Sequence, residues 1–413
     1  MSIRTPSTAS LCRFLQTNKA MRCLAPAPCA ALLLCLSASL PAKAQQPDPI
    51  QAYLQPLVDN HTIAGAVTLV ANSDHTVYLK AVGSRDLAAN APMRADALFW
   101  IASTSKPITV AAFMMLVDEG KINLDDPVEK FLPEFKGQMV GPRNPDPAGK
   151  TTAQLVPAVH PIRIREILSH SSGLRFRSAA QPGALDTLTL NDSVLTFAAE
   201  PLLFQPGTDY SYSNEGINTA ARILEVVTGM PYEQFLQERL FKPLGMKDTT
   251  FWPNAKQIAR IATTYKLDPA DKLLKPIPVS QLTYPLDDHQ HRYPMPAGGL
   301  FSTAHDVSIF AQMLLNGGMS RGHRYLTEAA IKQMTTEQNG GHGNTSYGLG
   351  LGLNKGSFGH GGAFKNNMDI NPATGRILVF MVQQDGPWGT PAGDTIVSTL
   401  QKLADQQVTA AAH

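Results

Sequence analysis

The segment GAVTLVANSDHTVYLKAV, residues 65–82, decides how the fold of this chain begins. Its two halves, 65–71 and 76–82, are rich in β-branched residues, and the polar sequence NSDH separates them. Two β-prone runs joined by a short polar turn are typical of an antiparallel hairpin. The segment therefore predicts that the chain opens with a pair of neighbouring strands.

A second hairpin is predicted near the other end of the chain, where residues 367–370 and 376–383 flank the turn sequence NPATG. Between the two hairpins the patterns are mostly helical. One helix is predicted over about 215–228, with apolar residues on one face and a glycine after its end. Another opens at Thr303 with a pattern similar to a capping box. A last helix, over about 394–407, is expected to pack on the sheet.

This order of strands, helices and strands predicts an α/β (α+β) fold, in which both chain ends build one antiparallel sheet flanked by helices. A mainly helical region, approximately residues 105–290, would be inserted between the two parts of the sheet. Two proline-rich stretches, 137–159 and 266–296, are expected to form irregular loops. Long loops in compact enzymes often border the functional site, so substrate selectivity is expected there.

The first 44 residues have the features of a secretory signal peptide. They contain five basic residues and no acidic one, then an apolar run over 29–40 and the sequence AKA at 42–44. The apolar run is too short to span a membrane. We therefore expect a periplasmic or secreted protein without a stable membrane anchor, whose mature domain is residues 45–413.

The predicted signal also contains all the cysteines of the chain, Cys12, Cys23, Cys29 and Cys35. A mature protein without cysteine excludes cysteine catalysis and cysteine-ligated metals. Removing the five basic residues leaves 30 Lys and Arg against 33 Asp and Glu, so no nucleic-acid partner is indicated. The sequence leaves open whether translation begins at Met1 or Met21, and it does not indicate an oligomeric state.

Three short motifs follow one another along the chain: Ser103-Thr104-Ser105-Lys106, Tyr212-Ser213-Asn214 and His360-Gly361-Gly362. The first is the only S-x-x-K sequence and lies where an apolar stretch gives way to a helix. A serine hydroxyl is a poor nucleophile at neutral pH, and a lysine one helical turn away can take its proton. The motifs therefore predict a serine hydrolase.

In this order the motifs resemble the active-site set of the β-lactamase and penicillin-binding-protein superfamily. The resemblance is strongest to the class C β-lactamase-like branch, which includes DD-peptidases and family VIII carboxylesterases. It covers most of the chain after residue 44 and includes LVDEGKINLDDPVEKFLPEF (116–135), IREILSHSSGL (164–174), PAGGLFSTAHDV (296–307) and FGHGGAF (358–364). The resemblance implies a β-lactamase/transpeptidase-like fold, with the active site in a cleft between the sheet part and the helical region.

Ser103 is the expected nucleophile. At a helix N-terminus its backbone N–H points toward a developing oxyanion, and Lys106 lies one turn later on the same face. Pro107 fits this position because the first turn of a helix needs no N–H there. Ser105 is the alternative hydroxyl, but it has no lysine three residues further on.

Tyr212 is expected to be the second acid/base group. Two nearby cations, Lys106 and a protonated His360, would lower the pKa of the Tyr212 phenol and let it relay a proton to the leaving group. The resemblance implies the same role for Tyr212, and it assigns Asn214 to the carbonyl or amide of the substrate. The alternative is a tyrosine packed beneath a turn, and Tyr210 is the residue most easily mistaken for Tyr212.

The third motif departs from the family pattern. β-Lactamases of this branch usually have Lys-Thr-Gly, whose ammonium helps to hold the carboxylate of the antibiotic, whereas His360 is largely neutral at pH 7. Gly361 and Gly362 allow close approach of the backbone, and the N–H of Ala363 is expected to pair with that of Ser103 as the oxyanion hole. The alternative is a buried structural histidine beside a glycine-rich turn.

Other polar residues are weaker candidates. His170 in LSHSSGL is expected to be structural, and Glu166 is not given the deacylating role of the class A glutamate. The sequence DDHQH at 287–291 has the groups of a metal site, but a solvated loop is the preferred interpretation because no HExxH motif accompanies it. We expect neither a metal nor a cofactor.

The sequence thus predicts an exported serine hydrolase that cleaves a small ester, amide or peptide through an acyl-Ser103 intermediate. A carboxylesterase is the preferred interpretation, followed by a DD-peptidase-like enzyme acting on D-amino acids or small peptides, and then by a β-lactamase. The alternatives from other classes are a non-catalytic penicillin-binding-like protein and a metal-dependent hydrolase. The identity of the substrate is left open, because it depends on the shapes of loops.

Overall fold

A computed structural model describes the fold. The described residues are 48–142, 154–181, 183, 185–279, 281–343 and 345–411. The predicted signal peptide and its cleavage site lie outside them. All the elements below belong to one unit, Pro47–His413.

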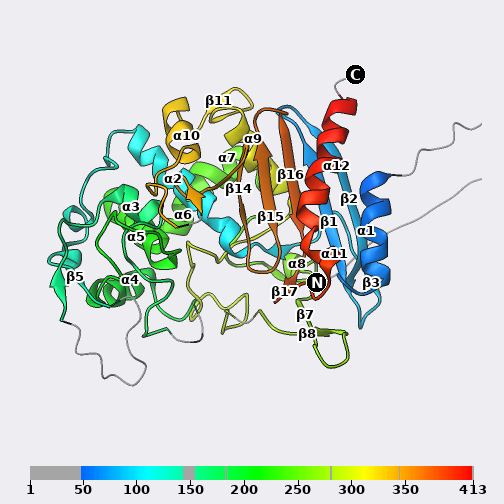
Figure 1. The fold of residues 1–413 in the computed structure, drawn as a ribbon, viewed down its shortest axis with the longest axis horizontal. Helices are drawn as coiled ribbons and strands as arrows, with labels where there is room; N and C mark the ends of the chain where they lie inside the picture. The colour runs from blue at the N-terminus through cyan, green and yellow to red at the C-terminus, as the bar shows by residue number, and fades with distance from the viewer. Residues whose placement is uncertain are drawn as a thin grey trace, which may run out of the picture. The chain divides into compact units, whose positions relative to one another are not determined.

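Eight strands form one antiparallel sheet, and they come from both ends of the chain, as predicted. The two predicted hairpins are confirmed and pair with each other through β1 and β16, where Val67 lies opposite Met381. Figure 1 shows these strands side by side, blue beside orange. In sheet order the strands are β12 (Ser346–Tyr347), β13 (Gly352–Asn354), β14 (Ser357–Gly361), β15 (Asn367–Asn371), β16 (Arg376–Met381), β1 (Gly65–Ala71), β2 (Thr76–Asp86) and β3 (Ala91–Pro92).

Two helices cover one face of the sheet, α1 (Pro49–Asp59) and α12 (Ile396–Ala411) (Figure 1). The predicted packing of the last helix on the sheet is confirmed, since Leu400 lies in a buried cluster with Val70 and Leu378. Residues of a strand alternate between faces, so β1 directs Val70 to this cluster and Leu69 to the core on the other side. A central strand covered on both faces explains why every residue of β1 is buried.

The opposite face is covered by α9 (Ala304–Leu315), which begins at the predicted Thr303 cap and packs on β1 and β16. Beyond it lies α2 (Ser105–Asp118), whose residues are buried from Ser105 to Leu116. A helix that is buried all round belongs to the interior of a large core. The N-terminal end of α2 is therefore held firmly between the sheet and the helical region.

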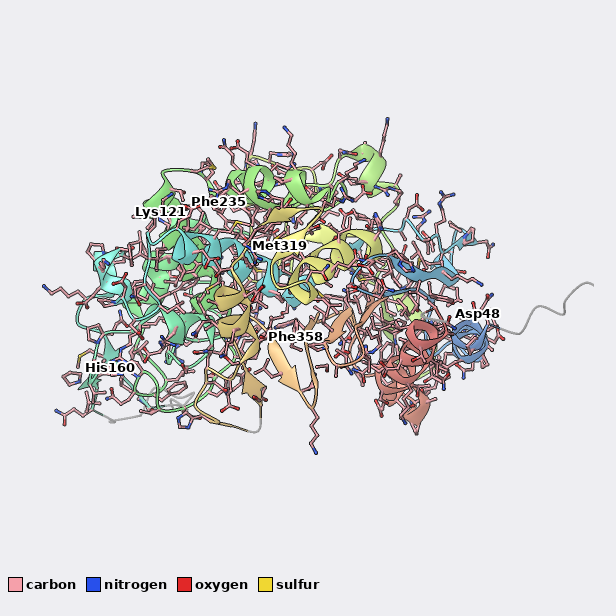
Figure 2. All side chains as sticks on the ribbon, turned by 90° about the horizontal axis from the view of Figure 1, so that it is seen from above. Asp48, Lys121, His160, Phe235, Met319 and Phe358 are labelled. Atoms are coloured by element: carbon pink, nitrogen blue, oxygen red, sulfur yellow. The ribbon has the colours of Figure 1, made fainter. Side chains whose placement is uncertain are left out.

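The helical region packs around α5 (Asn214–Thr228), which ends, as predicted, at a glycine in the left-handed conformation, Gly229 with φ of 69°. Figure 2 shows the side chains of this body from above, with Asp48 beside α1 on the sheet side and His160 on the helical side. The other helices are α3 (Ile164–Leu168), α4 (Leu190–Ala199), α6 (Tyr232–Leu236), a π-helical turn (Gln237–Phe241), α7 (Lys242–Leu244), α8 (Ala255–Ile258), α10 (Glu328–Thr335) and α11 (Pro391–Asp394). The described residues also form 3-10 turns at Ala102–Thr104, Val128–Lys130 and Pro133–Phe135.

The proline-rich stretches are only partly irregular, which corrects the expectation for them. Each contains residues of short ladders that pair across the stretch or with a neighbouring segment. The small ladders of the molecule are β5 (Met139–Val140) with β6 (Val156–Pro157), β17 (Gln384–Asp385) with β7 (Tyr265–Leu267) and β8 (Leu274–Pro276), β4 (Phe99–Trp100) with β9 (Phe301–Ser302), and β10 (Met319–Ser320) with β11 (His323–Arg324). Within the described ranges, no helix is long and apolar enough to cross a membrane.

Candidate active site

Ser103 lies in the 3-10 turn between β4 and α2, rather than in the first turn of α2 itself. It is the one residue between Ala97 and Leu116 that is not buried. The residue before it, Ala102, has a φ of 44°, in the left-handed region that alanine rarely adopts. Such strain costs on the order of 1 kcal/mol, and it persists only where packing enforces it. Ala102 is buried in a cluster with Trp100 and Phe364, so this packing presents the Ser103 hydroxyl to solvent.

Lys106 is fully buried, and its Nζ has three polar neighbours. Nζ lies 3.2 Å from Ser103 Oγ, 2.7 Å from Asn214 Oδ1 and 2.8 Å from the backbone O of Ala297. α2 supplies the lysine, α5 supplies Asn214, and the segment before β9 supplies Ala297. The structure therefore brings Ser103, Lys106 and Asn214 together, as the sequence predicts.

Burial lowers the pKa of the Lys106 ammonium well below its usual range. A neutral amine has two N–H groups and one lone pair. Asn214 Oδ1 and the carbonyl of Ala297 are acceptors only, so they take the two N–H groups. The remaining lone pair then faces the hydroxyl of Ser103. The expected substrate contact of Asn214 must come from its amide nitrogen, because Oδ1 is already bonded to Lys106.

Tyr212 is hydrogen-bonded to Ser103 through its side chain. The Lys106 Nζ is 4.6 Å from the centre of the Tyr212 ring. The expectation of a lowered Tyr212 pKa is wrong, because burial raises the pKa of this phenol above its usual value. Positive charges on Lys106 and His360 were expected to lower the Tyr212 pKa, but burial favours the neutral forms of both side chains. Tyr212 is thus a protonated hydrogen-bond donor at neutral pH.

His360 contacts Tyr212 from β14. Its Nδ1 lies 2.7 Å from the backbone O of Gly361, which only accepts, so Nδ1 carries the proton. Nε2 is then an acceptor, 3.0 Å from the hydroxyl of Tyr347 and 3.4 Å from that of Tyr212. Burial, and then the proximity of Lys106, lower the pKa of His360 to about 3. The neutral imidazole agrees with the expectation.

Two residues beside this group were not predicted to be part of the site. Tyr347, on β12, donates to His360, and no motif in the sequence singles it out except its closeness to the FGHGG stretch. His170 is fully buried, with ring centres 4.5 Å from Tyr212 and 4.6 Å from Tyr347. Tyr210, the possible misassignment, lies farther out, 6.0 Å from His170 and 6.1 Å from Tyr347. Tyr212 is therefore the tyrosine that contacts Ser103.

The glycines of the third motif bring β14 against the turn that carries Ser103. A Cβ added to Gly362 would lie 2.5 Å from the backbone O of Ile101, whereas one added to Gly361 would come no nearer than 3.5 Å to any atom, the backbone O of Asn366. Gly362 is therefore required for close approach, and Gly361 is not. Ala363, the expected second oxyanion donor, directly follows this contact and is exposed.

This difference predicts the effects of two neighbouring alanine substitutions. Gly362→Ala must push β14 away from Ile101, so the N–H groups of Ser103 and Ala363 separate, and we expect kcat/KM for an ester to fall about 10²-fold. Gly361→Ala is the matched control, expected to remain within about threefold of wild type because its Cβ has room. Steady-state kinetics and thermal unfolding of both variants test this. Equal losses would refute the close-contact argument.

A cavity of about 230 Å³ adjoins this group of residues and is lined by Tyr210, Tyr212, Tyr347 and His360 together with residues of β13 to β15. None of the described residues of the proline-rich stretches 137–159 and 266–296 lines it, so the described parts of these stretches do not support the expectation that they border the site. Ala297, directly after the second stretch, nevertheless reaches Lys106.

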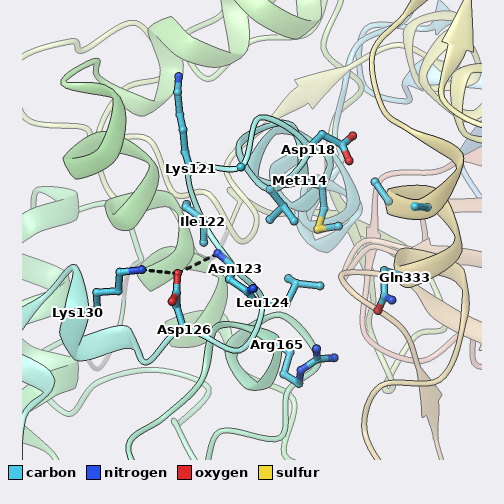
Figure 3. Close-up of a pocket in the computed structure, with 14 residues that line it drawn as sticks. Met114, Asp118, Lys121, Ile122, Asn123, Leu124, Asp126, Lys130, Arg165 and Gln333 are labelled. Atoms are coloured by element: carbon cyan, nitrogen blue, oxygen red, sulfur yellow. Dashed lines mark hydrogen bonds and ion pairs between the residues drawn. The ribbon is translucent and has the colours of Figure 1, made fainter.

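A second cavity, of about 450 Å³, lies at the other end of α2 (Figure 3). The helix has 14 residues, so this cavity is about 20 Å from Ser103. Its charged side chains already have partners: Lys130 pairs with Asp126 at 2.8 Å within the cavity (Figure 3), and Lys121 and Arg165 pair with Glu119 and Asp125 beside it. It therefore offers no group aimed at a ligand, and the site is placed at Ser103.

The weaker candidates take structural positions. Glu166 accepts from the N–H of Arg163 at 2.8 Å and caps α3. His291 bonds Asp288 at 2.8 Å on an exposed loop. In the part of the chain that the structure describes, no group of three or more His, Cys, Asp or Glu residues has the arrangement of a metal site.

An antiparallel sheet with helices on both faces, and a Ser-Lys-Tyr group where sheet and helices meet, define the β-lactamase/transpeptidase class of fold. The model of the Beta-lactamase family matches residues 50–400, so the chain belongs to that family of hydrolases. This confirms the resemblance read from the motifs.

Three known proteins show the range of functions among similar chains. Lovastatin esterase of Penicillium rubens is 31% identical over 230 residues, which cover 52% of this chain and 56% of the esterase. A candidate D-alanyl-D-alanine carboxypeptidase of Escherichia coli is 28% identical over 309 residues, covering 69% of this chain and 67% of that protein. The solved structure of EstCE1, a hydrolase with promiscuous acyltransferase activity, superposes with a TM-score of 0.70 at 24% identity, covering 87% of this chain and 97% of EstCE1.

Proposed function

We propose that the chain is an exported serine hydrolase without a cofactor, and that it cleaves esters of uncharged acyl groups through an acyl-Ser103 intermediate. The observation that carries the proposal is the buried side chain of Lys106, whose Nζ lies 3.2 Å from Ser103 Oγ. A nucleophile and its base within this distance are the signature of covalent catalysis. A non-catalytic binding protein would have no need for a buried lysine in this arrangement.

The chemistry follows from these positions. Lys106 takes the proton of Ser103 as Oγ attacks the carbonyl carbon, and the N–H groups of Ser103 and Ala363 receive the developing oxyanion. Tyr212 donates its phenolic proton to the leaving alkoxide and regains a proton from the ammonium of Lys106. A water molecule then attacks the acyl group, the same residues act in reverse order, and the hydroxyl of Ser103 is restored.

The choice of an ester over a β-lactam or a peptide rests on His360. Its neutral imidazole accepts a hydrogen bond from Tyr347 at 3.0 Å, with the hydroxyl of Tyr212 3.4 Å away, so the motif provides no positive charge for a substrate carboxylate. Both β-lactam antibiotics and the C-terminus of a peptide carry such a carboxylate. The similarity to Lovastatin esterase supports the same choice, whereas the E. coli relative keeps the peptidase as the second candidate.

A substrate panel tests this choice. We expect short-chain p-nitrophenyl esters to be hydrolysed much faster than D- or L-aminoacyl anilides and a chromogenic cephalosporin. His360→Lys adds a permanent charge to the cleft and should shift relative kcat/KM toward the cephalosporin by ~1 kcal/mol, about fivefold. Both substrates are measured for both proteins from about pH 5.5 to 9.

Two outcomes would contradict this assignment. Faster hydrolysis of the cephalosporin than of the esters by wild type would favour a β-lactamase. Faster hydrolysis of the D-aminoacyl anilides would favour the peptidase. In either case, if His360→Lys showed the same relative kcat/KM for the two substrates as wild type, the charge at this position would not select the substrate.

A further inference from the structure

We infer that Asn218 is a positioning residue, which orients Lys106 through the backbone of Ala297. This role rests on the proposed function, because it concerns the base of the same reaction. Asn218 lies on α5 one helical turn after Asn214, and only 8% of its surface is exposed. No hydrogen bond joins it to Ser103 or Lys106 in the described part of the chain, so its effect must pass through another group.

The connection is a short chain of buried hydrogen bonds. The N–H of Ala297 donates to Asn218 Oδ1 at 3.0 Å, and the carbonyl of the same residue accepts from Lys106 Nζ at 2.8 Å. One residue of backbone therefore links the side chain of Asn218 to the amine of Lys106. Any rotation of the Ala297 backbone would move one of the two acceptors that fix the direction of the Lys106 lone pair.

The peptide unit before Ala297 is held from the opposite side by α2. The carbonyl of Pro296 accepts from Thr109 Oγ1 at 2.7 Å, and the hydroxyl of Tyr232 lies 2.7 Å from the same Thr109 oxygen. The C=O and the N–H of one peptide plane are thus held by side chains of two different helices. This plane cannot turn without breaking a buried hydrogen bond, which costs about 1–3 kcal/mol.

The sequence after Ala297 explains why such holding is needed. Gly298 and Gly299 follow, and glycine has no side chain that could anchor the backbone by packing. The peptide plane that contains the Ala297 carbonyl is held by the N–H of Gly298, which donates to Met295 O at 3.0 Å, while Asn218 and Thr109 hold the plane before it. An asparagine suits this position because it accepts the N–H without adding a charge beside the lysine.

The titratable side chains near Lys106 make the inference measurable through the pKa of this lysine. Its titratable neighbours are Tyr212 across the ring face and the imidazoles of His170 and His360. Their pKa values are shifted by burial so that all three are neutral near pH 7. A single carboxylate introduced at position 218 would be the nearest new charge, and it would raise the pKa of Lys106.

Two substitutions at position 218 separate positioning from packing. Asn218→Asp keeps the oxygen that accepts from the Ala297 N–H and adds a negative charge. The charge should raise the pKa of Lys106, so the decline of kcat/KM at low pH should occur about one pH unit higher, and activity should recover at higher pH. Asn218→Leu removes the acceptor at similar size, so kcat for a p-nitrophenyl ester should fall about tenfold or more while KM changes less than about twofold.

Thr219→Val is the matched control. It alters a fully buried polar side chain on the next residue of α5, whose hydroxyl has no hydrogen-bond partner in the described chain. We expect wild-type kinetics for it at every pH. Thermal unfolding of all three variants shows whether they fold, and Asn218→Asp still provides the test if Asn218→Leu does not.

The outcomes distinguish this inference from the proposed function. Suppose that wild type is acylated at Ser103 but neither substitution at position 218 changes kcat or the low-pH decline of kcat/KM. The positioning role of Asn218 is then refuted, and the proposed function stands. If wild type shows no acylation by the esters or by a fluorophosphonate probe, the proposed function fails and this role fails with it.

Discussion

Replacing Ser103 with alanine is expected to lower kcat/KM for a p-nitrophenyl ester by at least about 10³-fold and to abolish covalent labelling by a fluorophosphonate probe. The hydroxyl is the only partner of the Lys106 lone pair in the arrangement described above, and no acyl intermediate can form without it. The fold should survive, because Ser103 is partly exposed and loses little packing. Intact mass of the labelled protein measures the adduct directly.

Ser105→Ala provides the matched control for this experiment. Ser105 is fully buried and its Oγ accepts from the N–H of Leu300 at 3.3 Å, so its loss costs about 1 kcal/mol of stability. Among the described residues, its hydroxyl makes no hydrogen bond with Lys106 Nζ, and we expect full labelling. An adduct on Ser105, or normal turnover by Ser103→Ala, would show that the nucleophile has been misassigned.

Replacing Lys106 with methionine should cost about 10²–10⁴ in the rate of acylation, the range expected for a lost general base. Methionine keeps the length and the burial of the side chain but has no lone pair of comparable basicity for the proton of Ser103. The measurement is single-turnover acylation by an ester under excess enzyme. Lys121→Met, about 20 Å away beyond the other end of α2, is the control and should behave as wild type.

The lowered pKa of Lys106 also fixes the sign of the pH dependence. The neutral amine is the active form, so kcat/KM is full above the folded-state pKa and declines as pH falls through it. Burial lowers that pKa, so the decline occurs at a lower pH than for an ordinary lysine. The residual kcat/KM of Lys106→Met should no longer decline at this pH. If the same decline remained in Lys106→Met, it would reflect the titration of another group.

The sequence predicts the fold well because its strongest signals are local. The β-branched runs around residues 65–82 and 367–383, and the glycine after α5, determine their hairpins and helix end through short-range sterics alone. The order of the motifs also predicts which residues meet, and the structure brings Ser103, Lys106 and Tyr212 together.

What the sequence cannot predict is the dielectric environment of the site. A charged lysine beside a tyrosine suggests a lowered phenol pKa, but only the three-dimensional structure shows that Lys106 is buried, that burial lowers the pKa of its ammonium, and that the Tyr212 pKa is raised instead. Tyr347 and Asn218 are missed for a related reason. They act on the site through His360 and through the backbone of Ala297, and such contacts leave no spacing pattern in the chain.

The pairing of β1 with β16 has a consequence for how this chain comes to work. Val67 and Met381 are neighbours in the sheet, so closing it requires one very long loop, and folds with such distant contacts form slowly. A chain still being synthesised contains Ser103 and Lys106 long before it contains His360 and Gly362. On the proposed mechanism, Ser103 therefore has no complete oxyanion-binding surface until almost the whole polypeptide has been made, and the topology would protect a growing chain from premature acylation.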